Sequence, residues 1–118
     1  MRALLTRVYV AFNARDLETV LAALHPDVDW ANGLDGGRVH GRADVRAYWT
    51  RQLETIDPRV EPVGFETDAA GRTVVRVHQV VRNPAGAVLS DGTVEHVYTI
   101  EGRLITRMDI RKPDGQRD

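Results

Sequence analysis

The stretch YVAFNARDLETVLAALHPDVDW, residues 9–30, contains the end of one helix, a break, a second helix and the start of a strand. Apolar residues recur at helical spacing over residues 4–12 and predict the first helix. Asp16 is placed to cap a second helix over residues 17–24. Pro26 disfavours the helical conformation for the residue before it, so the chain leaves the helix there and continues as an extended run.

The rest of the chain changes from helical to strand-like patterning. Apolar residues at spacings of three and four predict a third helix over residues 42–56. Beyond it the apolar residues alternate with period two, which is typical of strands with two different faces. Three helices followed by a sequential antiparallel meander predict an α+β fold with the helices on one face of the sheet. The expected strands cover residues 28–32, 60–67, 73–82, 87–100 and 103–111.

The composition is typical of one globular domain without disulfide support. The 118 residues predict a single domain over residues 1–111 and a polar tail over 112–118. The absence of cysteine excludes a disulfide scaffold, a thiolate nucleophile and a cysteine-ligated metal. A net charge of −1 gives no general attraction to nucleic acid, and no apolar run approaches the ~20 residues that span a bilayer. With no readable secretory signal, we expect a cytoplasmic protein that binds neither nucleic acid nor membrane.

Three stretches in order carry a family resemblance: residues 9–30, HGRADVRAYW over 40–49 and GRLITRMD over 102–109. With the order helix–helix–strand–helix–four strands, they resemble the SnoaL-like proteins of the nuclear transport factor 2-like superfamily, over roughly residues 3–110. That group contains polyketide cyclases, ketosteroid isomerases and members with no assigned activity, among which we expect this chain to fall. The resemblance implies a strongly curved antiparallel sheet wrapped round the helices, a cystatin-like cone whose open end is a pocket.

Within this resemblance, two carboxylates stand where acid–base chemistry is expected. The cyclases place an acid–base aspartate on the final strand, and Asp109 matches that position. Their polar residue on the preceding strand is a histidine, which Glu95 replaces, and a carboxylate close by would raise the pKa of Asp109. Asn32 matches their first-strand asparagine and, with Arg107, is expected to stabilise an enolate oxygen. The catalytic candidates are Asp109, Glu95, Arg107 and Asn32.

The same residues have a structural alternative. Strand alternation puts Arg107 on the same face as Asp109, and an arginine between Glu95 and Asp109 lowers the pKa of both carboxylates. The group would then be an ion-pair network rather than an acid–base site. Steroid-type isomerisation is not expected either, because Asn32 stands where ketosteroid isomerases carry their general-base aspartate and an amide cannot take up a proton.

Aromatic residues cluster in the segments expected to enclose the pocket. They are consistent with a lining for a planar ligand, although aromatic residues at helical spacing are also typical of an ordinary core. Strand alternation places Gln79 and Val97 on the strand face that is expected to line the pocket. His40 is expected beside the loop at the mouth of the pocket. The glycine-rich loop over residues 33–38 is either a lid or a plain connection. The expected substrate-binding residues are Tyr9, Phe12, Trp30, His40, Tyr48, Trp49, Gln79 and Val97.

The opposite face of the sheet is predicted to be too apolar to meet water. As a contiguous patch, this face would have a larger apolar area than monomeric proteins usually expose to water. We therefore expect a homodimer through the outer sheet faces. We expect no cofactor and no metal site, because the four histidines fall on different elements and faces. The residues assigned to this outer face are Val74, Arg76, His78, Val80, Val94, His96, Tyr98, Met108 and Ile110.

Two functions follow from these assignments. The first is a cofactor-free enzyme that moves protons by acid–base catalysis, of the isomerase or cyclase type, on a small hydrophobic carbonyl compound. The alternative is a non-catalytic ligand-binding or dimerisation module with the same cone. In that alternative, Glu95, Arg107 and Asp109 are locked in a closed salt-bridge network and have no role in proton transfer.

Overall fold

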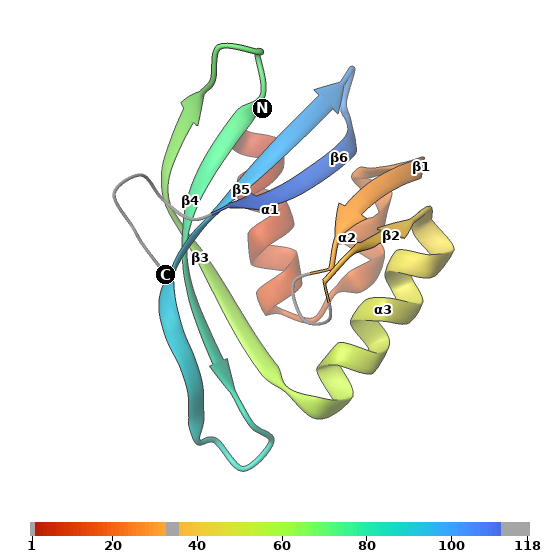
Figure 1. The fold of residues 1–118 in the computed structure, drawn as a ribbon. Helices are drawn as coiled ribbons and strands as arrows, with labels where there is room; N and C mark the ends of the chain where they lie inside the picture. The colour runs from red at the N-terminus through yellow and green to blue at the C-terminus, as the bar shows by residue number, and fades with distance from the viewer. Residues whose placement is uncertain (1, 33–35, 112–118) are drawn as a thin grey trace.

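The computed structural model describes residues 2–32 and 36–111. The first part of the expected lid (33–35) and the polar tail (112–118) lie outside the described residues. The described residues form three helices and one six-stranded sheet (Figure 1). In chain order the elements are α1 (Arg2–Asn13), α2 (Leu17–Ala22), β1 (Leu24–Ala31), β2 (Arg38–His40), α3 (Arg42–Thr55), β3 (Asp57–Thr67), β4 (Thr73–Arg82), β5 (Val88–Glu101) and β6 (Leu104–Arg111).

The helices lie where the sequence predicts them. Asp16 caps α2, because its carboxylate accepts hydrogen bonds from the backbone N–H and the hydroxyl of Thr19. The helix ends two residues earlier than predicted, since β1 already begins at Leu24. Pro26 follows in a part of β1 where the pairing with β6 shifts register, so its missing N–H does not interrupt a regular ladder.

The sheet differs from the prediction in two ways. Its strand order is β2-β1-β6-β5-β4-β3, and β1 pairs in parallel with β6, whereas the other neighbouring strands are antiparallel. The purely antiparallel prediction was therefore wrong at this one pair, because the period-two pattern does not reveal which strands become neighbours. The second difference is β2, a three-residue strand within the predicted loop that pairs with the end of β1. Three residues are too few for alternation to be recognised.

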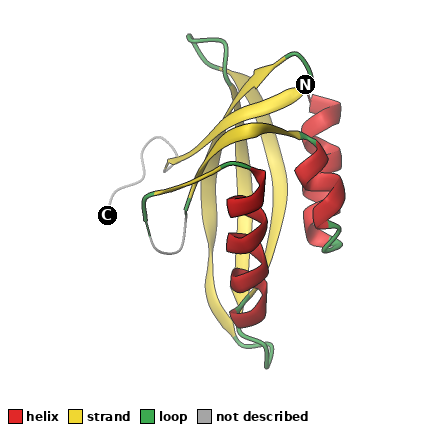
Figure 2. Ribbon diagram, turned by 90° about the vertical axis from the view of Figure 1, so that its right-hand side faces the viewer, coloured by secondary structure: helices red, strands yellow, loops and turns green. Residues whose placement is uncertain are grey.

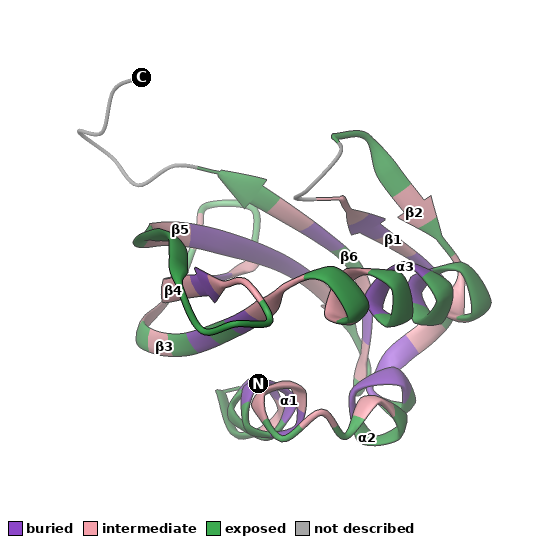
Figure 3. Cartoon of the chain, turned by 90° about the horizontal axis from the view of Figure 1, so that it is seen from below, coloured by how far each residue is buried: buried purple, intermediate pink, exposed green. Residues whose placement is uncertain are grey.

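The helices cover one face of the curved sheet, so the fold has two layers (Figures 2 and 3). α1 packs against β3, and α3 packs against β1 and β2. Apolar and aromatic side chains fill the space between the layers, and Leu5, Val45 and Ile105 are completely buried there. This confirms the predicted α+β class with three helices on a strongly curved sheet. None of the described helices has the length and apolar character needed to cross a membrane.

A side-chain clamp holds the end of α1 on the edge strand β3. The amide of Asn13 donates through Nδ2 to the backbone carbonyl of Val60 at 2.7 Å and accepts through Oδ1 from the backbone N–H of Val60 at 3.0 Å. Both backbone groups of one edge-strand residue are therefore satisfied by one side chain, as a further strand would satisfy them. Val60 lines the cavity described below, so this clamp also sets one of its walls.

Replacing Asn13 with alanine removes both hydrogen bonds and leaves two partly buried backbone groups without these partners. We expect the free energy of unfolding, measured by urea denaturation, to fall by about 1–2 kcal/mol. Arg59 provides the matched control, because its guanidinium hydrogen-bonds the Asn13 carbonyl in an exposed position. Arg59→Ala should change stability by less than about 0.5 kcal/mol. Equal effects of the two substitutions would contradict a specific clamp.

Candidate functional site

A cavity lies between the helices and the concave face of the sheet and is partly open to solvent. It measures about 120 Å³, taken as the space open to the centre of a water molecule. Its rings pack edge to face, with centroids 5.1 Å apart for Trp30 and Trp49 and 5.8 Å apart for Phe12 and Trp49. The lining includes the aromatic residues Phe12, Trp30, Tyr48, Trp49 and Tyr98 and the polar residues Gln52, Gln79 and His96.

The structure places the expected substrate-binding residues in four different environments. Tyr9 is buried behind the lining, where its hydroxyl contacts a lining residue. His40 is exposed on β2, and Val97 is buried on the opposite face of the sheet. Asn32 lies just beyond β1, where its backbone pairs with the glycines that precede β2, and it is not part of the lining. The expected residues that do line the cavity are Phe12, Trp30, Tyr48, Trp49 and Gln79.

The register of β4, β5 and β6 decides which side chains face the cavity. Residues paired directly across strands share a face, and His96 pairs with Ile110 while Tyr98 pairs with Met108. These four residues line the cavity. Their neighbours in the chain, including Glu95, point to the other side, which we call the outer face; it holds Glu95, Val97, Thr99, Arg107, Asp109 and Arg111.

The expected orientation of Glu95, Arg107 and Asp109 toward the cone interior was therefore wrong. The physical reason is that alternation assigns residues to two faces without saying which face the helices cover. On β4 the expected interior residue Gln79 does face the helices, together with Val75, Val77 and Val81, so these wrong assignments lie on β5 and β6. Five residues expected on the outer face lie inside instead: Val94, His96, Tyr98, Met108 and Ile110.

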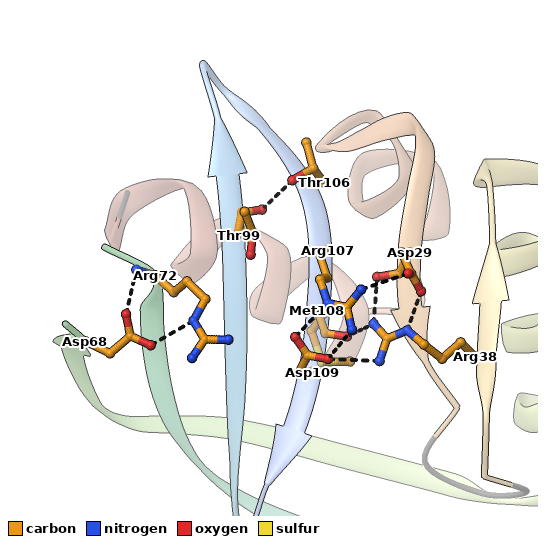
Figure 4. Close-up of polar contacts among 9 residues, drawn as sticks. All are labelled: Asp29, Arg38, Asp68, Arg72, Thr99, Thr106, Arg107, Met108 and Asp109. Atoms are coloured by element: carbon orange, nitrogen blue, oxygen red, sulfur yellow. Dashed lines mark hydrogen bonds and ion pairs between the residues drawn. The ribbon is translucent and has the colours of Figure 1, made fainter. Parts of the chain in front are cut away.

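On the outer face, two arginines and two aspartates form a closed ring across β1, β2 and β6 (Figure 4). Arg107 contacts Asp29 and Asp109, each at 3.0 Å, while Arg38 contacts Asp109 at 2.9 Å and also pairs with Asp29. Partial burial alone would raise the pKa of Asp109. The hydrogen bond and charge of Arg107, joined by Arg38, outweigh that effect and lower the pKa below its ordinary value. This is a salt-bridge network, as in the structural alternative, but Arg107 links Asp109 to Asp29 and not to Glu95 as that alternative expected.

Glu95 forms a second ion-pair group on the same face. It is 3% exposed, and its carboxylate lies 2.7 Å from Arg111 Nε and 3.7 Å from Arg76 Nη2. With two such groups, the outer face is charged over the strands where the sequence suggested an apolar patch. The argument for a homodimer through an apolar outer face therefore loses its basis, and the homodimer itself stays a prediction.

Three buried residues that the sequence did not bring together form a hydrogen-bonded group, two of them in the cavity wall and Tyr9 behind it. The hydroxyl of Tyr9 on α1 is 2.8 Å from His96 Nδ1 and 2.8 Å from the hydroxyl of Tyr98, both on β5. Burial lowers the pKa of His96 to about 4, so the imidazole is neutral at pH 7, and burial also raises the pKa values of the two tyrosines. The signal in the sequence was a histidine and a tyrosine two residues apart, and therefore on one face of the strand, beside the apolar Val94.

His96 is the one titratable group with a pKa near or below neutrality in the cavity lining, as far as the described residues go. No aspartate or glutamate of the described ranges belongs to that lining. The cavity thus offers hydrogen-bonding groups, namely His96, Gln52 and Gln79, within an apolar and aromatic wall. Among residues 2–32 and 36–111, no three histidine or carboxylate side chains come together in a way that would hold a metal ion.

Neutral burial of His96 predicts a specific loss of stability in acid. In the unfolded chain its pKa is near 6.5 and in the folded chain about 4, so the unfolded state binds more protons between these values. Stability should therefore fall as the pH drops from about 6.5 to 4, by about 3 kcal/mol from this residue. We expect His96→Gln, measured by urea denaturation at each pH, to lack this part of the decline. Identical pH profiles would show that His96 is not buried in the neutral form.

Comparison with known proteins places this site in a recognised fold. The family model described as a SnoaL-like domain matches residues 5–108. A search of curated proteins finds no match to the chain. The crystal structure of TerC, co-crystallised with polyporic acid, is 25% identical with a TM-score of 0.80, and the match covers 94% of this chain and 89% of TerC.

Two further structures agree with this fold. A nuclear transport factor 2-like protein of unknown function from Burkholderia pseudomallei is 28% identical with a TM-score of 0.81, covering 95% of this chain and 89% of that one. A candidate polyketide cyclase from Sinorhizobium meliloti is 20% identical with a TM-score of 0.79, and the match covers 92% of this chain and 94% of that one. Since the family model spans most of the sequence, this chain belongs to the SnoaL-like family and has the nuclear transport factor 2-like fold.

Proposed function

We propose that this protein binds a compact, ring-containing small molecule in the cavity between its helices and its sheet. The observation that carries the proposal is a partly open cavity walled by aromatic side chains with a few polar groups, which is how small-molecule sites are built. At about 120 Å³ the cavity is of the same order as the roughly 150 Å³ cavity that accommodates benzene. A single ring with a short substituent therefore matches the space.

The aromatic wall also supports a preformed site. Trp49 is held by edge-to-face contacts with both Phe12 and Trp30, and Trp30 contacts Tyr98 in the same way with centroids 6.2 Å apart. Such pairs prefer these geometries, so the rings keep their positions without a ligand. A flat apolar ligand would then lose little side-chain entropy on binding. TerC, which has the same fold, was co-crystallised with the small molecule polyporic acid, and this supports a small molecule as the occupant.

A second candidate function is acid–base catalysis of the isomerase or cyclase type on a hydrophobic carbonyl compound. The observation that favours it is His96, a titratable group in the cavity lining that can act on a bound carbonyl. The carboxylates expected for this chemistry lie on the outer face, and Asp109 is held ionised by two arginines. Binding without proton transfer is therefore the function that the geometry supports best.

Acetophenone, a one-ring ketone, is a suitable probe for the proposed binding. We expect a saturable titration in ¹H–¹⁵N NMR spectra of the labelled protein, with shifts concentrated at the cavity. Ile110 lines the cavity and is 39% exposed, so Ile110→Trp should narrow the mouth and weaken binding about ten-fold or more. Val63→Trp, at an exposed position outside the lining, is the control and should leave binding unchanged. Equal effects of both variants, or no saturation, would overturn the proposal.

Acetophenone can also be used to distinguish binding from catalysis. Acid–base activity would exchange the methyl protons of acetophenone for deuterium in D₂O, because enolisation breaks those C–H bonds. We expect the wild-type protein and His96→Gln to give the same slow exchange at pH 7, measured by the loss of the methyl signal. Faster exchange with the wild-type protein alone would instead establish the catalytic candidate and assign the proton transfer to His96.

A further inference from the structure

The hydroxyl of Tyr9 connects two buried groups that share a limited number of protons. Tyr9 lies 2.8 Å from His96 Nδ1 and 2.8 Å from the Tyr98 hydroxyl, and Tyr98 is 1% exposed. In the described part of the chain, these are the only hydrogen bonds that the side chains of the three residues make. Each hydroxyl has one proton to donate, and a neutral imidazole has one N–H. Two directions of donation along the chain of three groups satisfy both contacts. A third arrangement, in which Tyr9 accepts from both neighbours, leaves the Tyr9 hydroxyl proton without an acceptor among the described residues.

In the first direction, Tyr98 donates to Tyr9 and Tyr9 donates to Nδ1, so both hydroxyl protons are used. The imidazole proton then lies on Nε2. In the second direction, Nδ1–H donates to Tyr9 and Tyr9 donates to Tyr98, which leaves the hydroxyl proton of Tyr98 without an acceptor among the described residues. A buried donor without a partner is rarer and more costly than an unused lone pair. The first direction is therefore favoured.

The second imidazole nitrogen is open to the cavity. Nε2 of His96 has no hydrogen-bond partner within residues 2–32 and 36–111. No side-chain nitrogen or oxygen in those ranges is sealed from solvent without a partner, so Nε2 is accessible. His96 lines the cavity and is 8% exposed, which makes the cavity the space that Nε2 meets.

We infer that Tyr9 and Tyr98 hold His96 as the Nε2–H tautomer, so that His96 presents a fixed hydrogen-bond donor to the cavity and selects ligands with an unprotonated oxygen. Ketones, quinones and enolates carry such an oxygen. This inference rests on the proposed binding function and names the class of ligand for that site. Tyr9 and Tyr98 are positioning residues, since they act through His96 and not on the ligand. Burial supports the inference by keeping the imidazole neutral at pH 7, with a single N–H.

The tautomer can be measured directly in the unmodified protein. Long-range ¹H–¹⁵N correlation spectra of histidine-labelled protein distinguish a protonated ring nitrogen from a bare one. At pH 7 we expect His96 to show a bare Nδ1 and a protonated Nε2, while His40, exposed on β2, serves as the internal reference. Tyr9→Phe should shift His96 toward a mixture of the two tautomers. A protonated Nδ1 with a bare Nε2 in the wild-type protein would overturn the inference.

Ligand selection is tested with a matched pair of probes. α-Methylstyrene has the shape of acetophenone, with the carbonyl oxygen replaced by CH₂. We expect the wild-type protein to bind acetophenone about five-fold more tightly than α-methylstyrene, the effect of one net hydrogen bond. The preference should shrink in Tyr9→Phe. Equal binding of the two probes would overturn the inference and leave the proposed binding function standing, whereas binding of neither probe would overturn the proposed function as well.

Discussion

The antiparallel pairing of β5 with β6 is the constraint on which the rest of the site depends. Because His96 pairs with Ile110, and Val97 with Asp109, the strands present a neutral polar group to the helices and the charges to the other side. A shift of one residue would exchange the two sets of side chains. The aromatic cavity and the outer ion pairs are thus two consequences of one register.

The two faces satisfy their polar groups by different physical means. On the outer side of the sheet, Asp29, Asp109 and Glu95 each have two arginine partners, and Glu95 is 3% exposed. Inside, the polar groups are neutral, and hydrogen bonds between Tyr9, His96 and Tyr98 offset the loss of water. A charged group in the cavity would have no ion-pair partner to offset its loss of water. This explains why the pKa of His96 is lowered to about 4.

The sequence was sufficient to predict the fold and most of the aromatic residues that line the cavity, but not the polar groups of the site. Helical spacing identified Phe12, Tyr48 and Trp49, and the capping role of Asp16 was visible from its position. Period-two alternation could not tell the inner face of β5 from the outer one, because both carry apolar and polar residues. Val97 is 2% exposed on the outer face, so its burial is that of a core residue although it does not face the helices. The outer carboxylates were expected to be catalytic because the family resemblance assigned them that role, and alternation does not show which face the helices cover.

A crystal structure of the protein with acetophenone is the measurement that tests the account most directly. We predict that the ring lies against Trp49 and Tyr98 and that the ketone oxygen accepts a hydrogen bond from His96 Nε2, at about 2.7–3.2 Å. In the same structure, Asp109 should keep its contacts with Arg38 and Arg107. Acetophenone bound on the outer face beside Asp109, or a cavity in which Glu95 replaces His96, would contradict the account.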